Sequence, residues 1–263
     1  MEESDIEFGL NLGQMAGWNQ LFADWKRFRD YQPDGCFLAT INDRAVGTIT
    51  STCYGTDLAW IGMMLVHPEF RRRGIATALM THVIRWLQDS GVRCIKLDAT
   101  PAGAKVYEQL GFQSEWDFHR HQLQKTPADK SAITSETMIH GSLVDREAFG
   151  VDRSRLLETF SRDSSVIGDA DGFGMIRPGR LASYLGPVVC QSEEVATSLI
   201  DSLLAPVTGM VFWDVPGPNS SAKSIALQLG FTQARQLTRM WQGENLVSGR
   251  VDWQYALASP ATG

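Results

Sequence analysis

The sequence predicts an α/β protein built from two related domains, each with a mixed sheet flanked by helices. Three observations lead to this prediction. The length of 263 residues fits one large domain or two small ones. A pair of short sequence landmarks occurs once in each half of the chain. Apolar patterns typical of strands and helices follow one another in a regular order.

The landmarks are an apolar run ending in Asp and, further on, a Leu-Gly-Phe string that follows a helical stretch. In the first half they are Leu97-Asp98 and Leu110-Gly111-Phe112; in the second half they are Trp213-Asp214 and Leu229-Gly230-Phe231. A helix-compatible segment precedes each pair, at 74–87 and at 193–204. This internal similarity indicates two copies of one unit.

A polar stretch with Pro127, Asp129 and Lys130 separates the two halves and has the composition of a linker. We therefore expect domains at 1–125 and 138–263, joined by a linker at 126–137.

In the first half, strands are expected at 36–41 and 45–50, joined by a tight turn at Asn42-Asp43. A third strand at 58–66 is followed by a helix that ends near Gly91, a strand at 94–99 and a helix at about 102–110. Near the N-terminus, a stripe of large apolar side chains recurs at helical spacing and is expected to pack against the rest of the domain: Met15, Trp18, Leu21, Phe22, Trp25 and Phe28. The resulting order β-β-β-α-β-α-β implies a mixed sheet covered by helices.

Composition excludes several classes of protein. The 24 basic and 30 acidic residues give a net charge of −6, which argues against a non-specific nucleic-acid binder. No apolar run approaches the roughly 20 residues of a membrane helix. The acidic start shows no secretory signal, and the four cysteines are scattered, so a cytoplasmic, disulfide-free protein is expected.

The segment 64–77 carries the chemistry. An apolar strand runs through Val66-His67-Pro68 into three arginines (Arg71, Arg72 and Arg73) and then into Gly74-Ile75-Ala76, where a long helix begins. A helix N-terminus presents free backbone N–H groups and the positive end of its dipole, so it accepts an anion. Small residues let a phosphate approach the backbone, and arginines reach further oxygens. This construction fits a pyrophosphate, although an ordinary strand-to-helix turn with a solvated basic cluster would have the same spacing.

The string R-x-x-G-x-A, formed by Arg71, Gly74 and Ala76, resembles the acyl-CoA loop of the GNAT acyltransferase superfamily. The strand ending in Asp98 and the helix that carries Tyr107 before Leu110-Gly111-Phe112 are similar to the segments that follow this loop in that superfamily. Three further strings resemble a two-domain branch in which a second, diverged copy follows the first: Ala16-Gly17-Trp18-Asn19, Trp60-Ile61-Gly62-Met63 and Asp98-Ala99-Thr100-Pro101-Ala102-Gly103.

The resemblance implies two tandem acyl-CoA N-acyltransferase-like domains with mainly antiparallel sheets. It also implies acetyl-CoA as co-substrate, no metal, and direct transfer of an acetyl group to a primary amine of a small molecule or peptide. Tyr107 matches the residue that protonates the CoA thiolate. The matching cofactor-binding residues are Met64, Leu65, Val66, Arg71, Arg72, Arg73, Gly74, Ile75, Ala76 and Thr77. Asp98 and Glu69 are candidate bases, and Trp18 is a candidate acceptor-pocket residue. A non-catalytic acyl-CoA-binding regulator is the alternative.

The second half departs from this pattern. The residues Gln191-Ser192-Glu193-Glu194 stand where its phosphate loop is expected, and their charge would repel phosphate. Ala226 stands four residues before Gly230, where the first half has Tyr107. The second domain is therefore expected not to bind CoA in the usual way. His119 and His121 lack a third ligand nearby and are expected to be structural or surface residues.

Overall fold

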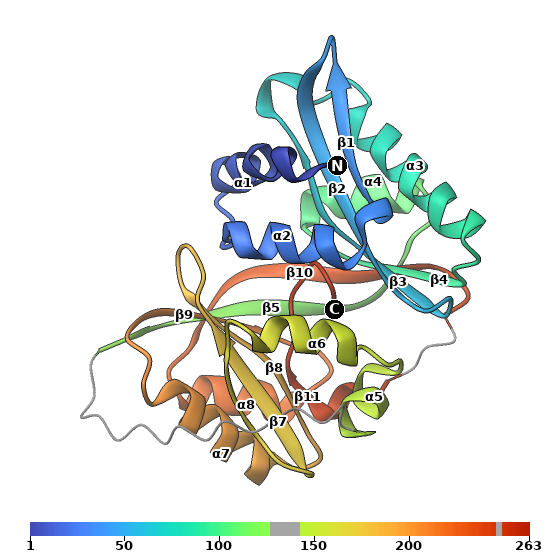
Figure 1. Ribbon diagram of the computed structural model, residues 1–263. Coiled ribbons are helices and arrows are strands. Elements are labelled where there is room, and N and C mark those ends of the chain that lie inside the picture. The colour runs from blue at the N-terminus through green and yellow to red at the C-terminus, as the bar shows by residue number, and fades with distance from the viewer. Residues whose placement is uncertain (127–142, 246–248) are drawn as a thin grey trace. The chain divides into compact units, whose positions relative to one another are not determined.

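The structure is a computed structural model that describes residues 1–126, 143–245 and 249–263 (Figure 1). The first half of the chain forms α1 (Ile6–Met15), α2 (Phe22–Tyr31), β1 (Cys36–Ile41), β2 (Arg44–Tyr54), β3 (Leu58–Val66), α3 (Ile75–Asp89), β4 (Cys94–Ala99), α4 (Pro101–Gln109) and β5 (Gln113–Lys125). The second half forms α5 (Leu143–Phe149), α6 (Ser154–Ser161), β6 (Ser165–Gly168), β7 (Gly172–Arg177), β8 (Ser183–Cys190), α7 (Glu193–Leu204), β9 (Gly209–Val215), α8 (Ser220–Gln228), β10 (Thr232–Gly243) and β11 (Gln254–Ala256).

These elements form two compact units. The first unit contains Met1–Ser114, Met240–Leu246 and Pro260–Gly263, and the second contains Glu115–Arg239 and Val247–Ser259. The chain therefore leaves the first unit inside β5 and returns to it inside β10. The division into domains at 1–125 and 138–263 remains a prediction, and residues 127–137 of the expected linker lie outside the described residues.

The predicted elements of the first half are confirmed, with two differences. The strand expected at 45–50 runs four residues further, to Tyr54, and the apolar stripe near the N-terminus spans two helices. The expected strands at 36–41, 58–66 and 94–99 coincide with β1, β3 and β4, and the turn residues Asn42 and Asp43 both have positive φ, at 48° and 60°. That conformation matches a tight hairpin whose twist suits the strands. The apolar stripe from Met15 to Phe28, however, spans two helices. Gly17, at φ 70°, lies just beyond the end of α1, and a new helix starts at Phe22.

The first unit has the strand order β1-β2-β3-β4-β10. In Figure 1, α1 and α2 lie on one side of β1 and β2, and α3 lies on the other. The α3 side holds a core in which helix residues such as Leu79, Met80 and Val83 meet strand residues such as Ile61 and Ile95. This packing holds α3 against the sheet, and the loop 67–74 joins the end of β3 to the start of α3.

The segment Pro260–Gly263 belongs to the first unit and packs against β2 and β3. The indole Nε1 of Trp60 donates a hydrogen bond to the Pro260 carbonyl at 3.3 Å, and the Tyr54 hydroxyl donates to the Thr262 carbonyl at 2.6 Å. Gly62 leaves room for this segment: a Cβ at Gly62 would lie 2.6 Å from the Ala261 carbonyl oxygen. Residues 200 positions apart in sequence thus complete one face of β3.

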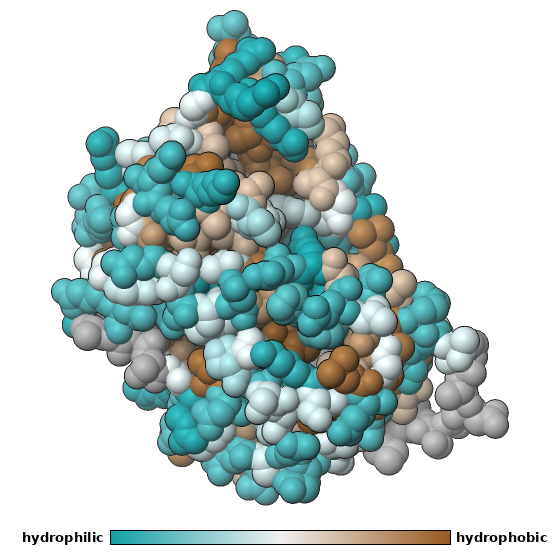
Figure 2. All heavy atoms as spheres, turned by 180° about the vertical axis from the view of Figure 1, so that it is seen from behind, coloured by the Kyte–Doolittle hydropathy of each residue, from teal (hydrophilic) through white to brown (hydrophobic). Residues whose placement is uncertain are grey.

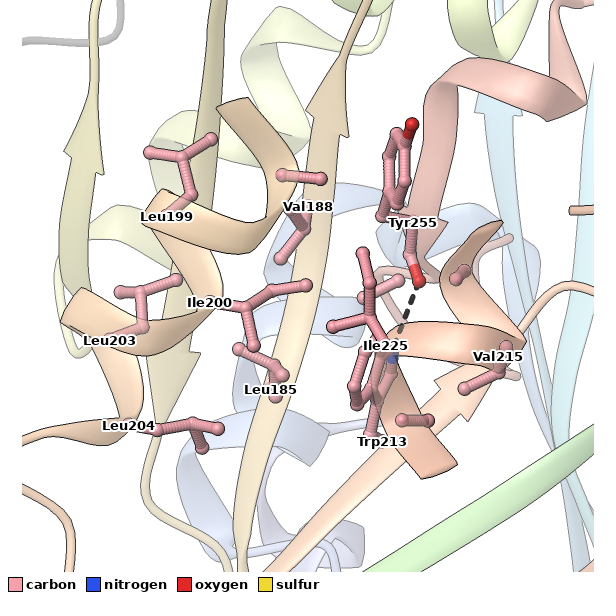
Figure 3. Packing of buried hydrophobic residues seen from close by; sticks show 14 of the residues in the cluster. Leu185, Val188, Leu199, Ile200, Leu203, Leu204, Trp213, Val215, Ile225 and Tyr255 are labelled. Carbon is pink, nitrogen blue, oxygen red and sulfur yellow. Dashed lines mark hydrogen bonds between the residues drawn. The ribbon is translucent and has the colours of Figure 1, made fainter. Parts of the chain in front are cut away.

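The second unit has the strand order β10-β5-β9-β8-β7-β6, with β11 beside β8. Figure 3 shows leucine and isoleucine side chains of α7 pointing toward Leu185 and Val188 on β8. Trp213 is fully buried there, and its Nε1 donates a hydrogen bond to the Tyr255 carbonyl at 2.9 Å. The apolar face of this sheet is therefore covered by helices that follow its strands, as in the first unit.

The opposite face of the second unit contains a buried ion pair. Arg120 on β5 lies directly across from Asp214 on β9. Its guanidinium donates two hydrogen bonds to the Asp214 carboxylate, from Nε to Oδ1 at 2.7 Å and from Nη2 to Oδ2 at 2.5 Å. Burial alone would raise the pKa of Asp214, but the Arg120 guanidinium outweighs it and holds that pKa below its usual value. Asp214, which the sequence marked only as a repeat landmark, is thus a structural carboxylate.

Hydrophilic residues cover most of the face shown in Figure 2, with smaller hydrophobic patches among them in both its upper and lower parts. In the part of the chain that the structure describes, no helix is both long and apolar enough to cross a membrane.

We expect Gly62→Ala to lower the melting temperature by several degrees. The added methyl group would meet backbone atoms of Ala261, and such overpacking costs roughly 1–3 kcal/mol. Thermal unfolding of four chains measures this: wild type, Gly62→Ala, a chain lacking residues 260–263, and the combination. The glycine substitution should have little further effect in the shortened chain. An equal effect in both backgrounds would contradict this account.

We expect Asp214→Asn to destabilise the protein by roughly 3–5 kcal/mol at pH 7, because it leaves the Arg120 guanidinium buried and unpaired. The difference from wild type should shrink as the pH falls through the lowered pKa of Asp214, below the ordinary range of an aspartate, where protonation removes the same ion pair. Denaturant unfolding between pH 3 and 7 measures both effects. Asp252→Asn, which breaks the exposed Arg250–Asp252 pair, is the control and should cost at most about 1 kcal/mol.

Candidate active site

The strands β3 and β4 run parallel and then separate. Their pairing extends from Leu58↔Cys94 to Ile61↔Leu97. Beyond that point β3 continues to Val66 and β4 to Ala99 without a further pair. The backbone of residues 62–66 on the β4 side is therefore not engaged by β4, and its polar groups are left for another partner.

A bulge in β3 accompanies this separation. On the opposite side of β3, Thr48 pairs with Leu65 and Thr50 pairs with Gly62, so β3 has one more residue than β2 between these pairs. Met63 has a φ of 51°, which is unusual for a residue with a side chain. The Thr48 hydroxyl donates a hydrogen bond to the Met63 carbonyl at 2.9 Å and holds the bulge in place. The bulge redirects the backbone of 63–66, the segment where the site was expected.

The loop after β3 ends in a helix N-terminus. A short 3-10 turn (Pro68–Phe70) leads to Arg72 and Gly74, which have φ values of 60° and 78°, and α3 begins at Ile75. The first helical hydrogen bond runs from the Ala78 N–H to the Gly74 carbonyl. The N–H groups of residues 75–77 lie ahead of that bond and point out of the helix end. The space in front of Gly74 is open, because a Cβ there would meet no atom within 4 Å.

The three arginines of the loop are exposed and differently placed. Arg71 donates from Nε to the Val66 carbonyl at 3.1 Å, which ties the loop to the end of β3. The Arg73 guanidinium lies 5.2 Å from the centre of the Phe70 ring, and Arg44 approaches the same ring at 4.9 Å. Cationic side chains and free N–H groups at one helix end make a site that favours an anion.

Tyr107 lies on α4, which begins right after β4. The Thr100 hydroxyl accepts a hydrogen bond from the Gly103 N–H at 3.2 Å and caps the helix start. The Tyr107 ring packs edge-on against Phe112 at 6.1 Å. Burial raises the pKa of Tyr107 to about 12. Its hydroxyl therefore keeps its proton throughout the neutral range and can donate it.

The fold brings together residues that the sequence places 43 positions apart. Met64 on β3, Ile75 at the start of α3 and Tyr107 on α4 all pack against the same core cluster of the first unit. The separated strand, the anion-favouring helix end and the protonated phenol thus surround one core of the first unit. Their roles in binding and catalysis remain predictions. The bulge at Met63 was missed, because no residue type in 58–66 marks it.

The remaining candidates have less specific surroundings. Asp98 lies on β4 one residue beyond the last pair with β3 and is partly buried. Glu69 is exposed and bonded to Arg44 at 3.2 Å. Trp18 lies in the connection between α1 and α2, partly buried, with its N–H bonded to the Gly13 carbonyl. Among the described residues, no group of three His, Cys, Asp or Glu side chains is placed to hold a metal ion.

The second unit has the same local geometry with different chemistry. The Phe231 N–H donates to the Ala226 carbonyl at 2.9 Å, just as the Phe112 N–H donates to the Tyr107 carbonyl at 3.0 Å. Ala226 is buried and carries no proton donor. In the second unit, Ser192 precedes α7, and its hydroxyl accepts a hydrogen bond from the Val195 N–H. Glu193 and Glu194 form the first residues of the helix. This helix end is already capped and is negatively charged, so it disfavours phosphate.

Comparisons with known proteins agree with this geometry. Residues 10–112 match the acetyltransferase (GNAT) family, and residues 142–256 match a second acetyltransferase (GNAT) domain. The chain is 25% identical over 241 residues to the holothin acyltransferase of a Pseudoalteromonas strain, covering 86% of this chain and 81% of that protein. Over 86 residues it is 34% identical to the N-alpha-acetyltransferase MAK3 of Arabidopsis thaliana, covering 30% of this chain and 45% of that one.

Solved structures extend the likeness over the whole chain. A crystal structure from Pyrococcus horikoshii, assigned to an acetyltransferase, superposes with a TM-score of 0.88 at 25% identity, covering 100% of this chain and 94% of that one. A tandem GNAT protein of clavulanic acid biosynthesis shares the fold, with a TM-score of 0.65 at 16% identity, covering 92% and 95%. The predicted tandem α/β fold and acyltransferase class are confirmed: the chain belongs to the GNAT acyltransferases and contains two GNAT domains.

Proposed function

We propose that this acyltransferase uses acetyl-CoA and transfers its acetyl group directly to a primary amine of a small molecule or peptide. The observation that carries the proposal is the junction of β3 and α3. There a stretch of strand backbone that is unpaired on its β4 side leads through the loop 67–74 to a helix end with free N–H groups, open space at Gly74 and three arginines. The acetylated amines implied by the names of the relatives agree with this class of acceptor.

The pyrophosphate of acetyl-CoA would lie on the N–H groups of residues 72–77, because these point out of the helix end toward open space. Arg72 and Arg73 are exposed beside it and would neutralise the phosphate charge, while Arg71 holds the loop to the strand through Val66. The pantetheine arm would follow the free backbone of Met64, Leu65 and Val66, which can form hydrogen bonds as a strand would.

The acyl carbonyl would lie beside the bulge, where a backbone N–H of β3 can stabilise the charge that develops on oxygen. A neutral amine would attack the carbonyl carbon, and the carbon–sulfur bond would break with its electron pair on sulfur. Tyr107 would then give its proton to the thiolate. With a pKa of about 12, the phenol holds its proton at neutral pH until the thiolate forms.

The amine must lose a proton before or during attack. Asp98 is the better placed of the two candidate bases, since it follows the point at which β4 leaves β3, whereas Glu69 is engaged by Arg44. Trp18 would form part of the wall around the acceptor. We propose the domain at 1–125 as the catalytic one and the domain at 138–263 as a diverged copy without CoA chemistry, because Ala226 and Glu193 replace the groups needed.

We expect Gly74→Glu to weaken acetyl-CoA binding by at least about tenfold, since a carboxylate at the helix N-terminus would repel the pyrophosphate. Isothermal titration calorimetry with acetyl-CoA measures the affinity. Gly55→Glu is the matched control: Gly55 also has a positive φ, 64°, and open space around it, but it lies in the β2–β3 turn. Equal affinities for the two variants would remove the helix end from the binding site.

We expect Tyr107→Phe to lower kcat by roughly 100-fold or more while the KM for acetyl-CoA changes little, because only the proton donor is lost. Release of free CoA in the presence of a panel of amines and peptides measures turnover. Tyr255→Phe is the control, since burial raises the pKa of that tyrosine to about 12 as well, in the second unit. Unchanged kcat in Tyr107→Phe would exclude the phenol as the acid. With wild type, binding of acetyl-CoA without turnover of any acceptor would count against amine transfer.

A further inference from the structure

The sheet of the second unit has one face that carries charged and aromatic side chains instead of an aliphatic core. Side chains directly across neighbouring strands share a face of the sheet. The register places Arg120 across from Asp214, Phe212 across from Tyr184, and Tyr184 across from Arg177. Four adjacent strands (β5, β9, β8 and β7) thus contribute to one polar face, entirely within the second unit.

Most of the polar groups on this face already have partners. Asp214 accepts two bonds from Arg120 and one from the Tyr184 hydroxyl at 2.8 Å. Arg177 donates to the Gly186 carbonyl at 2.7 Å and to the Ala258 carbonyl at 2.6 Å. Its guanidinium also lies 4.4 Å from the centre of the Tyr184 ring. Asp214 thus already accepts three hydrogen bonds, all from Arg120 and Tyr184.

Arg235 is a further cation of this cluster. It lies on β10, the strand next to β5, and it is only partly exposed. Its Nε is buried and has no hydrogen-bond partner among the described residues. Burial, together with the nearby positive charge of Arg120, lowers the pKa of Arg235 to about 10. Asp214 and Tyr184 act in the opposite direction with smaller effect.

A buried cation beside another cation, with an unsatisfied donor, lowers the stability of the fold. An apolar residue of similar length would fill the same space without that cost. The arrangement is instead typical of a site built for function at the expense of stability, in which a bound group supplies the missing charge. The group that fits a guanidinium fork is a planar or tetrahedral oxyanion, which accepts two parallel N–H bonds.

We propose that the second unit binds a small oxyanion, a carboxylate or phosphate group of a small molecule, at the Arg235 guanidinium beside the Arg120–Asp214 pair. The anion accepts the free Nε–H of Arg235, and it brings the charge of the cluster closer to neutrality. The site is separate from the helix end at Gly74, because all its residues belong to the second unit. It gives the diverged domain a ligand of its own, different from acetyl-CoA.

Thermal unfolding of the full chain in sodium phosphate or sodium succinate, with ionic strength held constant by sodium chloride, tests this proposal. One or both anions should raise the melting temperature of wild type in a saturable way, and the one that does so identifies the oxyanion. Arg235→Met should weaken that response by at least about tenfold in anion concentration. Without anion, Arg235→Met should melt at the same temperature as wild type or higher, because a buried unpaired cation is removed.

Three further variants sharpen the result. Arg162→Met removes an exposed arginine of the second unit and should keep the full response. In the Gly74→Glu background, where the anion site at the start of α3 is blocked, the part of the response that depends on Arg235 should remain. Arg235→Lys retains a cation and should keep part of the response. The proposal is overturned if neither anion stabilises wild type, if Arg235→Met keeps the response, or if Arg235→Met lowers the melting temperature without anion, as the loss of a purely structural residue would.

Discussion

The separation of β3 from β4 is the constraint on which the rest of the first unit depends. Pairing ends at Ile61↔Leu97, and the bulge at Met63 turns the following backbone away from the partner strand. Unpaired backbone inside a sheet is costly unless something else satisfies it. On one side of the strand, the Thr48 hydroxyl donates a hydrogen bond to the Met63 carbonyl and satisfies it. The other side is available to a ligand, and α3 begins where that ligand's charged end would lie.

The two GNAT domains have the same backbone geometry at one helix end, but only the first has the side chains expected for acetyl transfer. In each unit a helix ends at a Leu-Gly-Phe string, and the same backbone hydrogen bond closes the helix end. The Phe112 N–H donates to the Tyr107 carbonyl in one unit, and the Phe231 N–H donates to the Ala226 carbonyl in the other. Those bonds involve only backbone atoms, so they survive any side chain. The proton donor is a side chain and is lost. The start of α7 likewise retains its place after a strand, while Ser192 and Glu193 replace the glycine and arginines.

Charge is distributed differently in the two units. In the first, the loop arginines are exposed and cost little when no ligand is bound. In the second, arginines lie on a buried sheet face, where a charge requires a partner. Asp214 accepts hydrogen bonds from Arg120, and backbone carbonyls accept hydrogen bonds from Arg177. Only part of this buried charge contributes to stability, and the surplus at Arg235 accounts for the second ligand proposed for this protein.

The sequence by itself determined the local elements, because short-range patterns decide them. The strands at 36–41, 58–66 and 94–99, the hairpin turn at Asn42-Asp43 and the helix end at Gly74 all follow from residues adjacent in sequence. The repeat of Asp and Leu-Gly-Phe likewise indicated two GNAT domains.

Only the tertiary structure decided the features that depend on contacts between distant residues. These are the bulge held by Thr48, the return of β10 to the first unit, the packing of Ala261 against Gly62, and the meeting of Arg120, Asp214 and Arg235. A strand's hydrophobic pattern specifies which face is buried, but the pattern does not specify which strand lies beside it or where pairing stops. For the same reason, the sequence around Arg235 gives no sign that its Nε is buried and lacks a hydrogen-bond partner among the described residues.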